Sequence, residues 1–204
     1  MPRRPLVRVL LLALVPAAVV YVLAIALSAA AGIPSELVIR DLAQSCNTPM
    51  GHGLISSLGY LLWTAAAAIA LFGALAPRNG VRGRHRQLLL CGGAFSLLLC
   101  LDDMLLLHDR YIGSTFLYGL YAVFALAILF RFRSQVVKLG GGTFLLAVVL
   151  LGLSVIIDKT QEQIPIPYDS LQLIEEGAKF LGIATWLAFW VQAAARAALP
   201  KADA

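Results

Sequence analysis

Long apolar runs, separated by short polar stretches, dominate the chain. They cover residues of about 6 to 30, 53 to 76, 87 to 107, 113 to 130, 139 to 157 and 171 to 195. At roughly 1.5 Å of rise per residue, each run is long enough as a helix to cross a hydrocarbon core about 30 Å thick. The runs are continuous rather than alternating, which favours helices over the strands of a membrane barrel. We therefore predict an all-α fold, a polytopic bundle of about six transmembrane helices.

Composition supports a membrane protein built as a single domain. Hydrophobic residues make up 60% of the 204 residues and the mean hydropathy is +0.86, too apolar for a soluble domain of this length. No hydrophilic stretch is longer than about twenty residues, so 1–204 is predicted to be one integral membrane domain. A cleaved signal peptide is the alternative interpretation of the first run, but its length favours a retained helix.

The charged residues sort onto alternate sides of these runs. Ten of the eleven acidic residues lie in or beside one set of loops, and twelve of the sixteen Lys and Arg residues lie on the other side. The positive-inside rule makes the basic side and both termini cytoplasmic. Because orientation and anionic lipid account for these cations, the pI near 9.4 does not indicate nucleic-acid binding. The twelve cations are Arg3, Arg4, Arg8, Arg78, Arg82, Arg84, Arg86, Arg131, Arg133, Lys138, Arg196 and Lys201.

The third apolar run ends in a cluster of ionisable residues, with Asp102, Asp103, His108, Asp109 and Arg110. At about 100° per residue, Asp102 and Asp109 lie nearly on one line of a helix, and Asp103 and Arg110 lie on the next. Leucines surround the first two acids, so a lipid-facing position would cost on the order of 2.5 to 3.5 kcal/mol for each. We therefore expect both acids to face the interior of the bundle.

The last apolar run carries a second cluster near its outer end. Glu175 and Glu176 precede Lys179 by four and three residues, so the three side chains can meet on one face of a helix. Counted from the outer ends, the glutamates lie at about the same depth as Asp102 and Asp103, roughly 6 to 9 Å in. The two acid pairs are therefore predicted to converge on one site.

Converging carboxylates raise one another's pKa, so they must share protons, pair with Lys179 and Arg110 or bind a metal. Oxygen donors with some imidazole suit Zn, Mn, Mg or Ca, and an open position on Zn or Mn could activate water for hydrolysis. Glu175, Glu176 and Lys179 are the candidate catalytic residues. The candidate metal ligands are Asp102, Asp103, His108, Asp109 and Glu176.

Simpler interpretations apply to several of the same residues. Asp109 and Asp158 lie near helix ends, where solvated charge is common. His108 could cap its helix, and Glu175 with Lys179 could be an ordinary intrahelical ion pair. Tyr, Trp and Phe residues near the helix ends are predicted to be interfacial belt residues. The chain has no Cys-x-x-Cys pair, which disfavours a thiol-disulfide oxidoreductase.

Two resemblances rest on these motifs. Leu101-Asp102-Asp103 with His108-Asp109, followed by the segment 174–182, resembles a group of uncharacterised bacterial polytopic membrane proteins. This resemblance implies that the protein lies in a bacterial-type inner (plasma) membrane. Separately, Glu175-Glu176-x-x-Lys179 is similar to the motif of PrsW-type intramembrane metalloproteases. In those enzymes the glutamates serve catalysis, and later helices supply further Glu and His residues.

Two functions are compatible with this pattern. The first is a divalent-metal-dependent membrane hydrolase that acts from the outer side on a lipid or peptide. The second is a proton- or cation-coupled small transporter or sensor that uses the same acidic cluster. A scaffold subunit whose acids only dock a partner helix is a third possibility. In each case the lipid bilayer is the expected surrounding, and the oligomeric state is left open.

Overall fold

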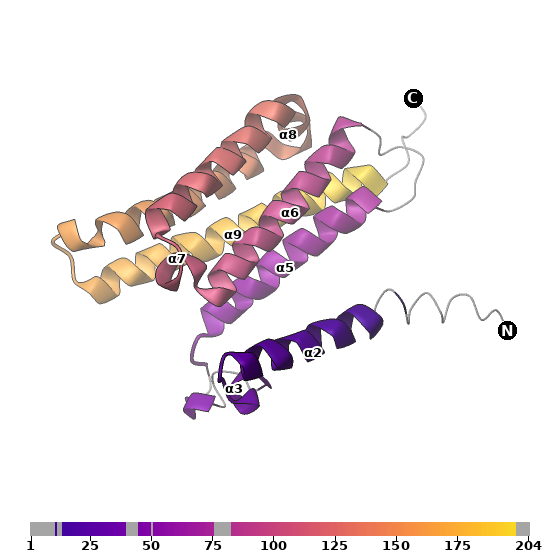
Figure 1. The fold of residues 1–204 in the computed structure, drawn as a ribbon. Helices are drawn as coiled ribbons and strands as arrows, with labels where there is room; N and C mark the ends of the chain where they lie inside the picture. The colour runs from indigo at the N-terminus through magenta and orange to yellow at the C-terminus, as the bar shows by residue number, and fades with distance from the viewer. Residues whose placement is uncertain (1–10, 12–13, 40–44, 50, 76–82, 199–204) are drawn as a thin grey trace. The chain divides into compact units, whose positions relative to one another are not determined.

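The computed structural model describes residues 11, 14–39, 45–49, 51–75 and 83–198 (Figure 1). These residues form helices joined by turns and short extended segments, and no strand occurs among them. The chain divides into two compact units, Met1–His52 and Gly53–Ala204. The predicted all-α fold is therefore confirmed, whereas the single-domain organisation stays a prediction.

The first unit contains the helices α2, Val15–Ala30, and α3, Ser35–Ile39. α2 has 16 residues and none of its side chains is buried. It ends where Gly32 adopts a φ of 71°, a left-handed conformation that glycine takes without steric cost. α2 is the described part of the first predicted span. Most of residues 6–13 lie outside the described residues, so whether this segment is retained is still a prediction.

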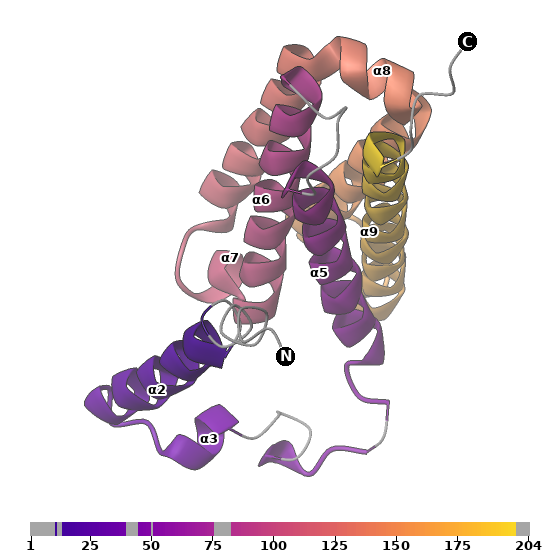
Figure 2. The same cartoon turned by 90° about the vertical axis from the view of Figure 1, so that its right-hand side faces the viewer.

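The second unit is a helical bundle in which α9 packs against both α5 and α8, and α5 packs against α6 (Figure 2). Four of its helices are long and apolar enough to cross a membrane. This supports a membrane protein, while the predicted number of six spans stays a prediction. The elements are α5 Leu54–Leu75, α6 Arg84–Leu105, α7 Leu107–Arg110, α8 Ser114–Thr160, the 3-10 turn η2 Gln161–Gln163 and α9 Tyr168–Ala198.

The fourth and fifth predicted spans, 113–130 and 139–157, lie within α8 as two helical arms on either side of a break. Non-helical backbone angles at Phe132 and Gly140 mark the break. The outer ends of the two arms meet, since Lys159 donates a hydrogen bond to Ser114. We expected a polar loop between the arms, but Phe132 and Val136 are buried there. The connection between the arms therefore packs against the core.

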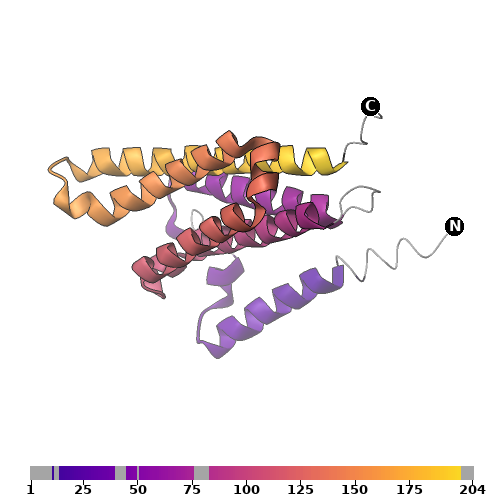
Figure 3. The ribbon, with the colours of Figure 1, turned by 90° about the horizontal axis from the view of Figure 1, so that it is seen from above.

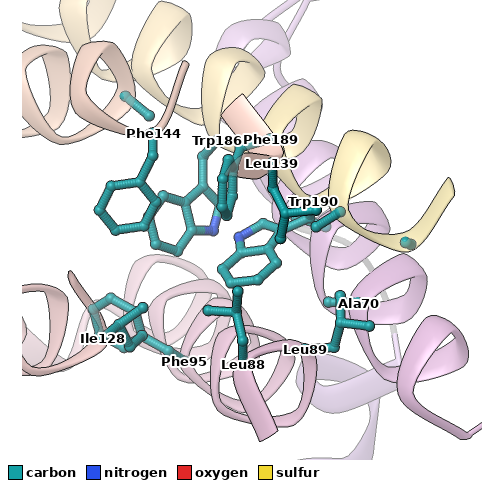
Figure 4. Packing of buried hydrophobic residues seen from close by; sticks show 14 of the residues in the cluster. Ala70, Leu88, Leu89, Phe95, Ile128, Leu139, Phe144, Trp186, Phe189 and Trp190 are labelled. Atoms are coloured by element: carbon teal, nitrogen blue, oxygen red, sulfur yellow. The ribbon is translucent and has the colours of Figure 1, made fainter. Parts of the chain in front are cut away.

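Aromatic side chains from α8 and α9 form the core of the bundle (Figure 4). The ring centroids of Phe189 and Trp190 lie 4.9 Å apart, and those of Phe144 and Trp186 lie 5.4 Å apart. Trp190 covers Gly92 of α6 so closely that a β-carbon there would lie 1.9 Å from the indole ring. This part of the bundle therefore has no room for a side chain at residue 92.

Basic residues gather at one end of this unit. Arg86 donates to the carbonyl of Ala74 at 3.1 Å, and Arg196 donates to the carbonyl of Lys138. These contacts join the C-terminal ends of α5 and α9 to the start of α6 and the bend of α8. Figure 3 shows that the other ends of α6 and α9, where the acids lie, share the opposite side of the bundle. The predicted segregation of charge is thus present in the fold, while its orientation in a membrane stays a prediction.

Candidate functional site

The acidic end of α6 is shaped by a break in the helix. α6 ends at Leu105, and Leu106 has φ 53° and ψ 42°, a left-handed conformation that is uncommon for a residue with a side chain. The chain then forms α7, Leu107–Arg110. We had placed Asp102 and Asp109 on one line of a continuous helix, and this placement is wrong because Leu106 reverses the direction of the chain.

The reversal brings His108 onto Asp102. The backbone N–H of His108 donates to Oδ1 of Asp102 at 2.9 Å, and Nδ1 of His108 lies 2.9 Å from Oδ2. An ionised carboxylate only accepts hydrogen bonds, so the proton of a neutral imidazole lies on Nδ1. Asp102 is 4% exposed, which confirms the prediction that it faces the interior. Both of its oxygens are therefore occupied by the same neighbouring residue.

Asp103 is bound by Lys179 from another helix. Nζ of Lys179 lies 2.5 Å from Oδ1 of Asp103, which joins α6 to α9. Asp103 is 8% exposed, again as expected for an inward-facing acid. Among the ion pairs of the described residues, Lys179 has no partner on its own helix. The ordinary intrahelical pair with Glu175 is therefore not formed.

The remaining acids of the site are less firmly held. Oδ1 of Asp109 lies 3.4 Å from Nε2 of His108, and Oδ2 of Asp158 lies 3.8 Å from Nζ of Lys159. Glu175 and Glu176 are half-buried, and neither forms an ion pair with any residue that the structure describes. Neither glutamate therefore has a direct ion-pair partner among the described side chains, although the Lys179 ammonium lies close enough to attract both.

The acids of the site line one cavity of about 370 Å³. Each of the helices α5 to α9 contributes to its wall, so the cavity lies inside the second unit. The acids of α6 and α9 thus border the same space, and their role there stays a prediction. Every predicted site residue lines this cavity: Asp102, Asp103, His108, Asp109, Glu175, Glu176 and Lys179.

The inner part of the cavity is aromatic. Trp63, Phe95 and Trp186 line it, and the ring of Trp186 lies 6.4 Å from Trp63 and 5.9 Å from Phe95 between centroids. Nε1 of Trp186 donates to Oγ of Ser96 at 2.8 Å, which fixes the orientation of the indole. The wall of the cavity is thus continuous with the packed core shown in Figure 4.

Several lining residues were missing from the sequence prediction. Tyr60, Tyr118 and Tyr121 line the cavity, although tyrosines near helix ends were expected to be interfacial belt residues. The ring of Tyr118 lies 5.3 Å from the imidazole of His108. The hydroxyl of Tyr121 is buried beside the carboxylate of Asp102, although it makes no hydrogen bond of ordinary geometry with the described residues. Tyr118 and Tyr121 lie three residues apart on α8, and this spacing was the sequence signal that they share one face of the helix.

The donors of the predicted metal centre are not gathered around one point. Within the described ranges, no group of three or more His, Cys, Asp or Glu side chains is arranged to hold a metal ion. Asp102 is engaged by His108 and Asp103 by Lys179, so these two buried carboxylates already have partners. A divalent metal at this site stays a prediction.

A family model described as a domain of unknown function (DUF8692) matches residues 9–193. The chain belongs to this family. The match to DUF8692 includes every residue that lines the cavity. No curated protein and no solved structure is significantly similar to the chain. The resemblance to PrsW-type metalloproteases stays a prediction.

Proposed function

We propose that this DUF8692 protein is a proton- or cation-coupled small transporter of a bacterial-type inner membrane. The observation that carries the proposal is the pairing of two buried acids at a cavity wall, Asp102 with His108 and Asp103 with Lys179. Ionisable residues inside apolar helices are costly and are typical of ion pathways and proton relays. Both pairs contain a group that can take up or release a proton, which is the chemistry that coupling requires.

The charge balance of the cavity supports the same function. Six carboxylates line it with one lysine ammonium and one imidazole, and Lys159, which does not line the cavity, lies 3.8 Å from the carboxylate of Asp158. Protons or a bound cation would stabilise the remaining excess of negative charge at the buried acids. Cation entry would therefore displace protons from the carboxylates, so that binding of one species is linked to release of the other. In the proposed orientation the acidic end faces the outer side and the basic end faces the cytoplasm.

The test is a pH-jump current measured with the purified protein in proteoliposomes on a solid-supported membrane. Wild-type protein is expected to give a transient current that Asp103→Asn reduces severalfold. Glu176→Gln serves as a second variant in case Asp103→Asn fails to fold. The matched control is Asp169→Asn, because Asp169 is an exposed acid of α9 that does not line the cavity. Currents that are equal in wild type and both cavity variants would overturn the proposal.

The metal-dependent hydrolase stays a prediction with less support from the geometry. Its candidate catalytic residues, Glu175, Glu176 and Lys179, do line the cavity, but the described donors do not assemble a metal centre. Stoichiometric Zn or Mn in the purified protein, lost together with lipid or peptide hydrolysis in Glu176→Gln, would favour the hydrolase over the transporter.

A further inference from the structure

We infer that the cavity binds an amphiphilic organic ammonium, with the ammonium group among the carboxylates and the apolar part against the aromatic wall. This inference rests on the proposed function and deepens it, because it names the class of cation that the site takes.

The two zones are separated along the helices. On α9, Trp186 follows Glu175 by eleven residues, which corresponds to roughly 16 Å of helix. On α6, Phe95 precedes Asp102 by seven residues, or about 10 Å. All four residues line the same cavity, so its acidic and aromatic ends lie at different depths. A ligand that satisfies both ends must itself have a charged end and an apolar end.

The size of the cavity suits a small organic molecule. Its volume is about 370 Å³, whereas a water molecule takes up only about 30 Å³ of the liquid. Cavities of this size are typical of sites for small organic molecules, which are mostly apolar with a few polar groups. The buried hydroxyl of Tyr121, beside the carboxylate of Asp102, is such a polar group within the wall.

The contacts of Lys159 show how Tyr118 and Asp158, two residues of the cavity wall, bind an ammonium group. Nζ of Lys159 lies 5.2 Å from the centre of the Tyr118 ring and 3.8 Å from the carboxylate of Asp158. An aromatic face and a carboxylate thus hold one ammonium together, the combination by which proteins bind organic cations. Nζ of Lys179 forms an ion pair with the carboxylate of Asp103. Glu175 and Glu176 have no such partner among the described residues, and they are the acids that the ligand would engage.

The experiment measures binding of 4-phenylbutyltrimethylammonium to the full-length protein in lipid nanodiscs. All three tryptophans of the chain lie in this unit, and two of them, Trp63 and Trp186, line the cavity, so tryptophan fluorescence reports occupancy directly. We expect saturable binding, with at least about tenfold weaker binding of tetramethylammonium, which lacks the apolar part, and of neutral 4-phenylbutanol. Calorimetry provides the dissociation constants independently.

Two variants address the two zones separately. Glu176→Gln removes a charge from the acidic zone and is expected to weaken ammonium binding about tenfold without changing the binding of 4-phenylbutanol. Gly152→Leu adds bulk to the cavity wall, where a β-carbon meets no atom within 4 Å, and is expected to weaken binding of the whole probe. The matched control, Gly119→Leu, lies on the exposed side of the same helix and should bind like wild type.

The outcomes separate this inference from the proposed function. The inference would be overturned if the ammonium probe and 4-phenylbutanol bound with equal affinity. It would also be overturned if neither Glu176→Gln nor Gly152→Leu changed the affinity for the ammonium probe. Absence of probe binding in a protein that still gives Asp103-dependent pH-jump currents would overturn the inference alone. Absence of both binding and currents would overturn the inference and the proposed function together.

Discussion

The two ends of the bundle are built on different principles. Around Trp190 the helices approach so closely that residue 92 must be glycine, and apolar side chains fill the space. Around Glu175 the same helices leave a cavity bordered by carboxylates, some of which have no described partner. The packed end is therefore held by close apolar contacts, whereas the acidic end is held by ion pairs and keeps further acids that a purely structural role does not require. The following four substitutions test this division, beginning with the largest expected effect.

Replacement of Gly92 by valine should disrupt the packed end. The new β-carbon would lie 1.9 Å from the Trp190 ring, and overpacking that a core cannot relax costs about 3 kcal/mol. We expect a much lower yield of monodisperse protein and a lower melting temperature in detergent. Gly119→Val is the control, because no atom lies within 4 Å of its β-carbon position. Similar melting temperatures for the two variants would contradict the division into a packed and an open end.

Replacement of Lys179 by alanine should also destabilise the fold, through the acidic end. It leaves Asp103 buried without its ammonium partner, a loss of roughly 3 kcal/mol for a buried pair. The double variant Asp103→Asn/Lys179→Ala should recover most of that loss, because no uncompensated charge remains. Thermal unfolding of the wild type, the two single variants Asp103→Asn and Lys179→Ala, and the double variant completes a double-mutant cycle. Strictly additive effects would show that the pair does not couple α6 to α9.

Replacement of Ser96 by alanine tests the boundary between the two ends. It removes the acceptor for the indole N–H of Trp186, and an unpaired buried donor costs about 1 to 2 kcal/mol. The cost should fall in a Trp186→Phe background, where that donor is absent. An unchanged cost in this background would assign the effect of Ser96 to its other bond, to the carbonyl of Gly92.

Replacement of Glu175 by glutamine should change the free energy of unfolding least, within about 0.5 kcal/mol. Glu175 forms no ion pair among the described residues, so no stabilising contact is lost. Asp169→Asn, an exposed acid of the same helix, is the reference in the same thermal assay. A loss of more than about 1 kcal/mol would make Glu175 a structural residue and weaken the comparison.

The sequence predicted the helices, the inward-facing acids and Lys179 as a cation for them, but not which acid each partner would take. Apolar runs locate helices because the bilayer demands internal hydrogen bonds, and buried acids must face inward because lipid solvates them poorly. The left-handed conformation of Leu106 has no such signal, since leucine is an ordinary helix residue. The choice of Asp103 by Lys179 was not predictable either, because it depends on how α6 and α9 pack.

The carboxylate of Asp102 connects the chemistry of the site to the path of the backbone. One of its oxygens accepts from the main chain of His108 and the other faces the imidazole. The two contacts of this one carboxylate hold the corner between α6 and α7. The electrostatics of the cavity and the path of the chain therefore depend on the same two oxygen atoms, and Asp102→Ala should speed amide hydrogen exchange at His108.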